Sequence, residues 1–257
     1  MSVALRAFVV GYTGETGKAL VKVLAKDNRY GSVKLIGRRN AEIDYGIEKS
    51  EAEKKFSQHV IDFSKLNDYS TVFEESDVGF CALGTTLRKS GAEQMRVIDH
   101  DYVIRIAELA LETGCKEFHL VTSKAANPQS HIFYLRLKGE IEEDLKTACI
   151  FPNYVAFYRP GTLMCNRTER RFMESVVKTL LKPVAALSPT WITTPVTVLA
   201  QAMANAPFCL ASCMRRRAIE KGPGDLDDSR VFVVENDLIF DLAAKTDDNQ
   251  EQATESQ

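Results

Sequence analysis

Short apolar runs alternate with amphipathic stretches over the first 160 residues of the chain. Each run is rich in β-branched or aromatic residues and is apolar at nearly every position, which is typical of strands buried on both faces of a sheet. The predicted strands are residues 7–10, 33–36, 59–61, 78–83, 118–121 and 154–158. The stretches between them have helical patterns, and the predicted helices are residues 16–26, 65–75, 93–112 and 132–146.

Strands and helices that alternate in this order predict a parallel sheet covered by helices on both faces. Because the connections between parallel strands are right-handed, the predicted fold class is α/β: a Rossmann-type doubly wound parallel sheet with a small C-terminal lobe. Residues 1–160 form the predicted core, residues 161–244 a C-terminal segment packed on the same domain, and residues 245–257 a polar, disordered tail.

The rhythm changes after residue 160. The predicted elements there are helices over residues 173–181, 196–206 and 236–244 and a short strand over residues 231–234. Asn236 is expected to cap the last helix. The pattern therefore predicts a less regular C-terminal third.

Composition narrows this picture mainly by exclusion. The 257 residues carry a net charge of −2, so no direct binding of nucleic acid is expected. No apolar run is expected to approach the roughly 18–20 residues of a membrane span, and the N-terminus is interpreted as a strand rather than a signal peptide. The six cysteines show no CxxC spacing and are expected to be reduced cytosolic thiols. The four histidines show no paired spacing, so no metal site is predicted.

Gly11, Gly14 and Gly17 follow the first predicted strand and open the first predicted helix. This context is the fingerprint of a dinucleotide site: Gly11 permits the tight turn, Gly14 lets the backbone approach a diphosphate, and Gly17 lets the helix pack on the strand. The helix N-terminus then offers N–H groups and partial positive charge to phosphates. An ordinary tight turn is the alternative. A P-loop fits less well, because Ala19 stands where that loop needs Ser or Thr.

The second predicted strand ends in Arg38 and Arg39. A site for NAD carries an acidic residue at this position, which binds the ribose 2′-hydroxyl, whereas two guanidinium groups suit a 2′-phosphate. NADP(H) is therefore the predicted cofactor, and the alternative is a pair of exposed loop arginines. Asp62 and Phe63 follow the third predicted strand and are candidates to flank adenine, although Asp62 could equally cap the next helix.

Ser123, Tyr134 and Lys138 are the candidate catalytic residues. Ser123 follows the fifth predicted strand, at the sheet edge where ligands of such folds bind, and Tyr134 and Lys138 share one face of the next helix. A free phenol has a pKa of about 10, and a nearby ammonium favours its phenolate. The alternative is a half-buried tyrosine beside a solvated lysine. The position of the pair after the fifth strand favours the catalytic interpretation.

Together these residues resemble the short-chain dehydrogenase/reductase superfamily in its atypical or extended branch. The chain looks most like the animal Tat-interacting oxidoreductase-like proteins, also described as metastasis suppressors, in segments 14–17, 35–39, 77–86, 101–103, 122–126, 134–140 and 157–161. The resemblance covers residues 5–206 and implies an NADP(H) site formed by Gly11, Thr13, Gly14, Glu15, Thr16, Gly17, Arg38, Arg39, Asp62, Phe63, Leu83, Gly84, Thr85, Tyr134, Lys138 and Leu163. Arg159 either approaches the nicotinamide or belongs to a strand-ending turn.

Two functions of different classes follow. The first is an NADPH-dependent oxidoreductase that transfers hydride to or from a carbonyl or alcohol-type small molecule, with Tyr134 as acid/base and Ser123 on the substrate oxygen. The second is an NADPH-binding regulatory protein, redox-sensing or related to transcription or nuclear transport, with little or no turnover. The presence of Ser123, Tyr134 and Lys138 favours the enzyme, because a scaffold has no need for them.

The remaining expectations concern partners and location. A small-molecule substrate, regulatory protein partners and a monomer or homodimer fit both functions. A cytoplasmic location is expected, together with a nuclear one if the basic run 215–217 acts as a signal rather than as a solvated surface. The substrate and the role of residues 208–229 do not follow from the sequence.

Overall fold

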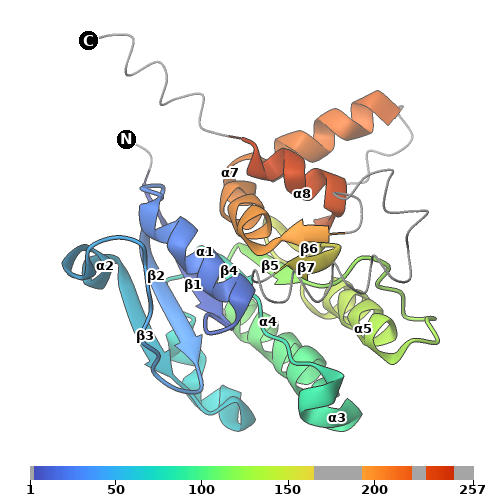
Figure 1. Ribbon diagram of the computed structural model, residues 1–257, viewed down its shortest axis with the longest axis horizontal. Coiled ribbons are helices and arrows are strands. Elements are labelled where there is room, and N and C mark those ends of the chain that lie inside the picture. The colour runs from blue at the N-terminus through green and yellow to red at the C-terminus, as the bar shows by residue number, and fades with distance from the viewer. Residues whose placement is uncertain (1–2, 165–192, 222–229, 246–257) are drawn as a thin grey trace.

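The computed structural model describes residues 3–164, 193–221 and 230–245 of the chain. Within them, a parallel seven-stranded sheet has the order β3-β2-β1-β4-β5-β6-β9 (Figure 1). The strands are β1 (Leu5–Val10), β2 (Tyr30–Gly37), β3 (Phe56–Val60), β4 (Val78–Cys81), β5 (Glu117–Val121), β6 (Tyr154–Arg159) and β9 (Val231–Glu235). The chain leaves β3 at one edge and returns to β4 beside β1, so the strand order reverses there. The predicted doubly wound fold is confirmed.

Strand β1 shows why these runs are apolar at every position. Ala7 and Val9 belong to the core on one side of the sheet, whereas Phe8 and Val10 belong to the core on the other. Helices α1 (Glu15–Lys26), α7 (Val196–Lys221) and α8 (Asn236–Ala243) cover the first face, and η1 (Phe63–Val72), α4 (Tyr102–Glu112) and α5 (Phe133–Ala148) cover the second (Figure 1). The central strands β1, β4, β5 and β6 are therefore buried on both faces, whereas the edge strand β3 is largely exposed.

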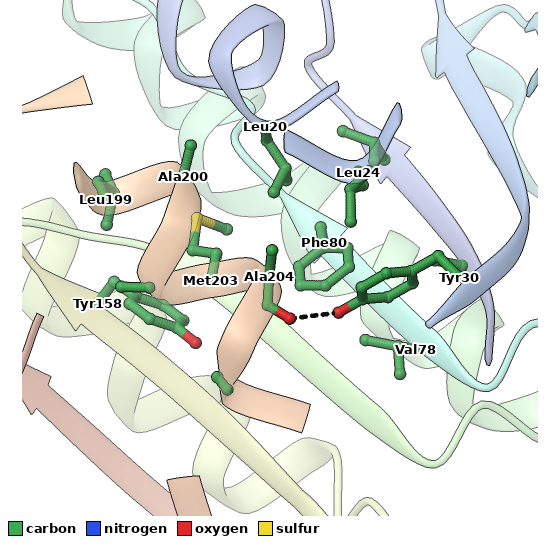
Figure 2. Packing of buried hydrophobic residues seen from close by; sticks show 14 of the residues in the cluster. Leu20, Leu24, Tyr30, Val78, Phe80, Tyr158, Leu199, Ala200, Met203 and Ala204 are labelled. Atoms are coloured by element: carbon green, nitrogen blue, oxygen red, sulfur yellow. Dashed lines mark hydrogen bonds between the residues drawn. The ribbon is translucent and has the colours of Figure 1, made fainter. Parts of the chain in front are cut away.

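Figure 2 shows how the first face is filled. Leu20 and Leu24 of α1 lie beside Met203 of α7, above Phe80 of β4. All four side chains are fully buried. The strong packing between α1 and α7 joins residues almost two hundred positions apart, so the C-terminal segment completes the core that the first strands begin.

Several predicted elements are corrected. Residues 49–55 form helix α2 (Lys49–Lys55), and residues 63–72 form a 3-10 helix rather than an α-helix. Residues 87–112 form α3 (Leu87–Arg96), which is kinked at Gly91 with a φ of +73°, then a π turn η2 (Val97–Asp101) and α4. Two unpredicted strands, β7 (Thr162–Met164) and β8 (Thr193–Pro195), pair in parallel. The helix predicted over residues 173–181 and the tail from residue 246 lie outside the described residues.

Helix α7 runs past its predicted end and through Pro207, which cannot donate an N–H to the helix. The hydroxyl of Tyr30 donates to the carbonyl oxygen of Ala204 at 2.7 Å in the turn before this proline (Figure 2). By length and composition, residues 196–217 are also long and apolar enough to cross a membrane, with a mean hydropathy of 1.4 over an 18-residue window, a run that the sequence analysis did not pick out. Slightly more than half of this segment, 56 %, is buried inside the protein, and its packing on α1 and α8 accounts for its apolar side.

Asn236 does not cap α8, contrary to the sequence prediction. Glu235 holds the cap position and Asn236 lies in the first turn. The Asn236 side chain instead accepts hydrogen bonds from the N–H of Gly161, at 3.1 Å, and from the hydroxyl of Thr194. The residue therefore joins α8 to the loop after β6 and to β8.

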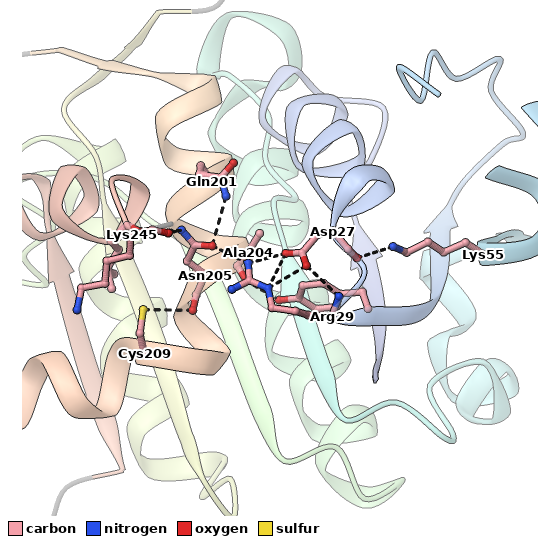
Figure 3. A network of polar contacts seen from close by, with 10 residues as sticks. Asp27, Arg29, Lys55, Gln201, Ala204, Asn205, Cys209 and Lys245 are labelled. Atoms are coloured by element: carbon pink, nitrogen blue, oxygen red, sulfur yellow. Dashed lines mark hydrogen bonds and ion pairs between the residues drawn. The ribbon is translucent and has the colours of Figure 1, made fainter. Parts of the chain in front are cut away.

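Asn205 of α7 holds the end of α8 in place (Figure 3). Its Nδ2 donates to the carbonyl oxygens of Leu242 and Lys245, both at 2.8 Å. Its Oδ1 accepts a hydrogen bond from Nη2 of Arg29 at 2.7 Å, and Arg29 in turn pairs with Asp27 at 2.6 Å. The Asn205 side chain, at 2 % exposure, thus links the turn before β2 to the last helix.

We expect Asn205→Ala to lower the free energy of unfolding by about 2 kcal/mol, because it removes the partner of buried carbonyl groups and of a charged donor. Guanidinium denaturation measures this loss. Gln201→Ala, one turn earlier on α7, is the matched control: its contact to Asn205 is longer, at 3.3 Å, and its loss should cost less than about 1 kcal/mol. Equal losses in the two variants would contradict the proposed role of Asn205.

Candidate functional site

A cleft opens at the carboxyl ends of β1, β2 and β4, where the strand order reverses. Ligands of open α/β sheets bind at this switch point. The cleft has a volume of about 200 Å³ and is lined by Gly11, Tyr12, Thr13, Gly14, Ile36, Gly37, Arg38, Phe63, Ala82, Leu83, Gly84, Thr85, Ile98 and Tyr102. The structure therefore brings together many of the residues predicted for the cofactor site, namely Gly11, Thr13, Gly14, Arg38, Phe63, Leu83, Gly84 and Thr85.

The three glycines of the first turn have different surroundings. Gly11 has a φ of +83°, and a Cβ there would lie 2.6 Å from the backbone of Ala82. A Cβ on Gly17 would lie 2.3 Å from the carbonyl oxygen of Gly11, so α1 packs directly on the turn. A Cβ on Gly14 would meet only that carbonyl oxygen, at 3.4 Å. Packing thus requires Gly11 and Gly17, whereas Gly14 has space on its cleft side.

Helix α1 begins at Glu15, and no side chain caps it. The first N–H groups of the helix therefore lie beside the cleft without a side-chain acceptor, which suits a phosphate. The Glu15 carboxylate forms an exposed ion pair with the Lys18 ammonium, with 3.2 Å between Oε1 and Nζ. The Thr16 side chain is buried. These surroundings fit the diphosphate of a dinucleotide, held by backbone rather than by side chains.

A second cavity of about 510 Å³ adjoins the first, and Arg38, Phe63, Ile98 and Tyr102 line both. Arg38 is exposed at their junction, and the ring of Phe63 lies 5.7 Å from that of Tyr102. Arg39 is also exposed but lines neither cavity. Arg38 therefore stands at the junction of the two cavities, and the role of Arg39 stays a prediction.

Asp62 lines the second cavity and also caps η1, accepting a hydrogen bond from the N–H of Ser64 at 2.9 Å. The hydroxyl of Ser64 donates to the same oxygen at 2.7 Å, and these hydrogen bonds lower the pKa of Asp62. The capping role that the sequence left open is present in the structure.

Tyr134 and Lys138 lie on one face of α5, with the Lys138 ammonium 6.0 Å from the centre of the Tyr134 ring. Tyr134 is 37 % exposed, whereas Lys138 is 5 % exposed. The Lys138 ammonium forms an ion pair with Asp99 of the π turn at 2.9 Å. Sequence reasoning missed Asp99. Its spacing of four residues from the buried Met95 and Val103 places an acid on the core side of a helix, which is the signal that could have revealed it.

Ser123 lies in the loop after β5, where its hydroxyl donates to the carbonyl oxygen of Lys124 at 3.3 Å. The same loop packs tightly on α5. The N–H of Asn127 donates to the carbonyl oxygen of Leu135 at 3.0 Å, and a Cβ on Gly139 would lie 2.2 Å from the backbone of Pro128. The Ser123 loop therefore lies against the turn of α5 that carries Tyr134.

Arg159 has the surroundings of a structural residue. Its guanidinium pairs with Glu142 of α5 at 2.5 Å and with Glu235 of β9 at 3.0 Å. These two ion pairs favour the interpretation of Arg159 as part of a strand-ending turn.

Leu163 lies on β7 opposite Thr194 and does not line the two cavities described above.

No family model matches the chain. The protein HTATIP2 of Rattus norvegicus is 36 % identical to it over 246 residues, which cover 93 % of this chain and 90 % of the rat protein. The chain belongs to the HTATIP2 family. The family resemblance predicted from the sequence is thereby confirmed, because the match extends over nearly the whole of both chains.

Solved structures with the same fold agree with this family. A short-chain dehydrogenase/reductase family oxidoreductase from Burkholderia thailandensis has a TM-score of 0.63 at 15 % identity and covers 98 % of both chains. MoeE5 in complex with UDP-glucuronic acid and NAD has a TM-score of 0.62 at 14 % identity and covers 90 % of this chain and 75 % of its own. This HTATIP2-family member thus has the same Rossmann-type fold as these two structures.

The relatives correct the predicted location. A protein of Scheffersomyces stipitis named FMP52-1, mitochondrial, is 31 % identical over 198 residues, which cover 75 % of this chain and 82 % of its own. This name contradicts the cytoplasmic and nuclear location expected from the sequence. Composition and reduced cysteines do not distinguish compartments. Within the basic run 215–217, Arg217 of α7 forms ion pairs with two acids of α8, Asp237 at 3.0 Å and Asp241 at 2.5 Å. These contacts favour a role in packing α7 against α8 over a role as a localisation signal.

Proposed function

We propose that this protein is an NADPH-dependent oxidoreductase that transfers hydride between the nicotinamide and a carbonyl or alcohol-type small molecule. One observation carries the proposal. The switch-point cleft and the face of α5 with Tyr134 and Lys138 are joined through Asp99, whose carboxylate contacts Thr85 of the cleft wall at 2.7 Å and Lys138 at 2.9 Å. Nucleotide-binding and proton-transfer groups thus share one edge of the sheet.

In this proposal the cleft would hold the dinucleotide, whose nicotinamide would supply or accept the hydride. The turn 11–14 and the N-terminus of α1 hold the diphosphate, and the wall Leu83–Gly84–Thr85 supports the chain of the cofactor beyond it. Glu15, Thr16, Arg39, Asp62 and Leu163 remain proposed contacts on the strength of the family resemblance.

The Tyr134 hydroxyl gives a proton to the substrate oxygen during reduction and takes one back during oxidation. The Ser123 hydroxyl donates a hydrogen bond to the same oxygen and orients it. In this proposal Lys138 holds the nicotinamide ribose, and its ammonium lies 6.0 Å from the centre of the Tyr134 ring. Tyr134 is 37 % exposed, so in this proposal the substrate reaches it from solvent.

We expect Arg38→Ala to weaken NADPH binding roughly 10- to 100-fold while NADH binding stays within about threefold, because a hydrogen bond to a charged group contributes about 1.5–3 kcal/mol. Only NADPH has a 2′-phosphate for Arg38 to bind at the junction of the two cavities. Fluorescence titration of both nucleotides with wild type and variant measures the change. Arg216→Ala on α7, which removes an exposed positive charge that lines neither cavity, is the matched control. Equal affinities of the wild type for NADPH and NADH would overturn the NADPH assignment.

A further inference from the structure

The π turn η2 places Asp99 inside the protein. The N–H of Tyr102 donates to the carbonyl oxygen of Val97, five residues earlier, so this turn holds one residue more than an α-helical turn. Ile98 and Tyr102 line the cleft, while Asp99 is buried at 2 % exposure and Asp101 is exposed. Two acids of one turn therefore have opposite surroundings.

Both oxygens of Asp99 are engaged by different parts of the site. Oδ1 accepts the N–H of Thr85 at 2.7 Å, and Oδ2 accepts the Lys138 ammonium at 2.9 Å. A Cβ on Gly84 would lie 3.3 Å from Oδ2, so the lack of a side chain at Gly84 leaves room for the carboxylate. One buried group thus joins the wall of the cleft to α5.

The other titratable groups around the pair do not replace either partner. Cys81 of β4 is fully buried, and burial raises its pKa to about 12, so it remains a neutral thiol. Tyr134 faces the pair from α5. One turn further along α5, Glu142 is engaged by Arg159. Asp99 is therefore the carboxylate that balances the Lys138 ammonium among the residues described here.

We propose that Asp99 is a positioning residue of this site, which fixes the Lys138 ammonium with one carboxylate oxygen and the Leu83–Thr85 wall of the cleft with the other. Lys138 then acts as one half of a buried ion pair rather than as a free cation. The catalytic meaning of this pair rests on the proposed function, because it concerns the same Lys138 that is assigned to Tyr134 and the ribose.

The pair predicts opposite pH responses for its two single variants. In Asp99→Asn the buried ammonium loses its counter-ion and gives up its proton more readily, so the unfolded state binds more protons and stability relative to wild type rises with pH. In Lys138→Met the buried carboxylate takes up a proton more readily, so stability relative to wild type falls with pH. The double variant has neither charge, so its free energy of unfolding should change with pH as that of wild type does.

Denaturant unfolding of wild type, both single variants and the double variant between pH 5 and 9 tests this prediction. The unfolding equilibrium constant relative to wild type should change by up to about tenfold per pH unit, the slope of one proton. Glu93→Gln, which removes an exposed acid of α3, is the matched control, and its stability should follow that of wild type across the pH range. Parallel curves for both single variants would overturn the proposal.

Hydrogen exchange at the Thr85 amide tests the second half of the proposal and needs no variant. This amide donates to a buried carboxylate and should exchange slowly in the wild-type protein; rapid exchange would overturn the proposal. Asp99→Ala should accelerate the exchange at least about tenfold, whereas Asp99→Asn keeps an acceptor oxygen and should restore slow exchange. If the wild type binds no dinucleotide, the proposed function fails, but the pH slopes and the exchange rates still decide the role of Asp99.

Discussion

Tyr134→Phe is expected to lose roughly 10²- to 10⁴-fold of its turnover with carbonyl substrates, while it binds NADPH with unchanged affinity. The substitution removes only the hydroxyl that exchanges a proton with the substrate oxygen. The ring is 37 % exposed at the start of α5, so it contributes little to the core and its shape is retained. The loss should therefore appear in kcat rather than in nucleotide binding or in the free energy of unfolding.

NADPH oxidation over a panel of aldehydes and ketones measures this loss, and nucleotide titration of the same samples measures the affinity. Tyr45→Phe removes the same hydroxyl from a tyrosine that packs on Phe56 and does not line the cleft, and it should leave turnover unchanged. Undiminished turnover in Tyr134→Phe would contradict the role of the phenol. A wild type that binds NADPH but turns over no carbonyl would favour the regulatory alternative.

The sheet was predictable because its signals are local. Each of the central strands β1, β4, β5 and β6 carries its apolar run in four to six neighbouring residues, and burial on both faces makes that run continuous. Helix α2 gave no such signal, since Ala52 is its buried residue and charged residues surround it. Strands β7 and β8 are three residues long and pair across thirty positions, so neither has a period of its own to detect.

The residues of the candidate site also divide into those that a local sequence signal marks and those that depend on distant partners. The glycine turn, Arg38 and the wall after β4 follow strands directly, and the sheet brings the strand ends together at one edge. Asp99 lies 39 positions before Lys138, and although its spacing from Met95 and Val103 indicates that it faces inward, no short motif connects it to Lys138. Arg159 was ambiguous for a similar reason, because its partners Glu142 and Glu235 lie on two other elements.

Gly17→Ala and Gly14→Ala should separate folding from nucleotide binding within one turn. In Gly17→Ala the new Cβ would lie 2.3 Å from the carbonyl oxygen of Gly11 and 2.6 Å from Cα of Tyr12. Both are backbone atoms, so α1 must move away from β1 and the core between them must open. We expect a loss of about 3 kcal/mol or more in the free energy of unfolding, because overpacking that displaces backbone lies at the upper end of its usual cost.

Gly14→Ala is the matched change on the open side of the same turn. Its new Cβ would meet only an oxygen at 3.4 Å, and the backbone of Gly14, with φ of −77°, is accessible to alanine. The variant should fold within about 1 kcal/mol of wild type but bind NADPH at least about tenfold more weakly, because the methyl group occupies the space proposed for the diphosphate. Thermal unfolding and nucleotide titration of both variants measure the two effects. Unchanged affinity in Gly14→Ala would place the diphosphate elsewhere, and wild-type stability in Gly17→Ala would contradict the close packing of α1 on the turn.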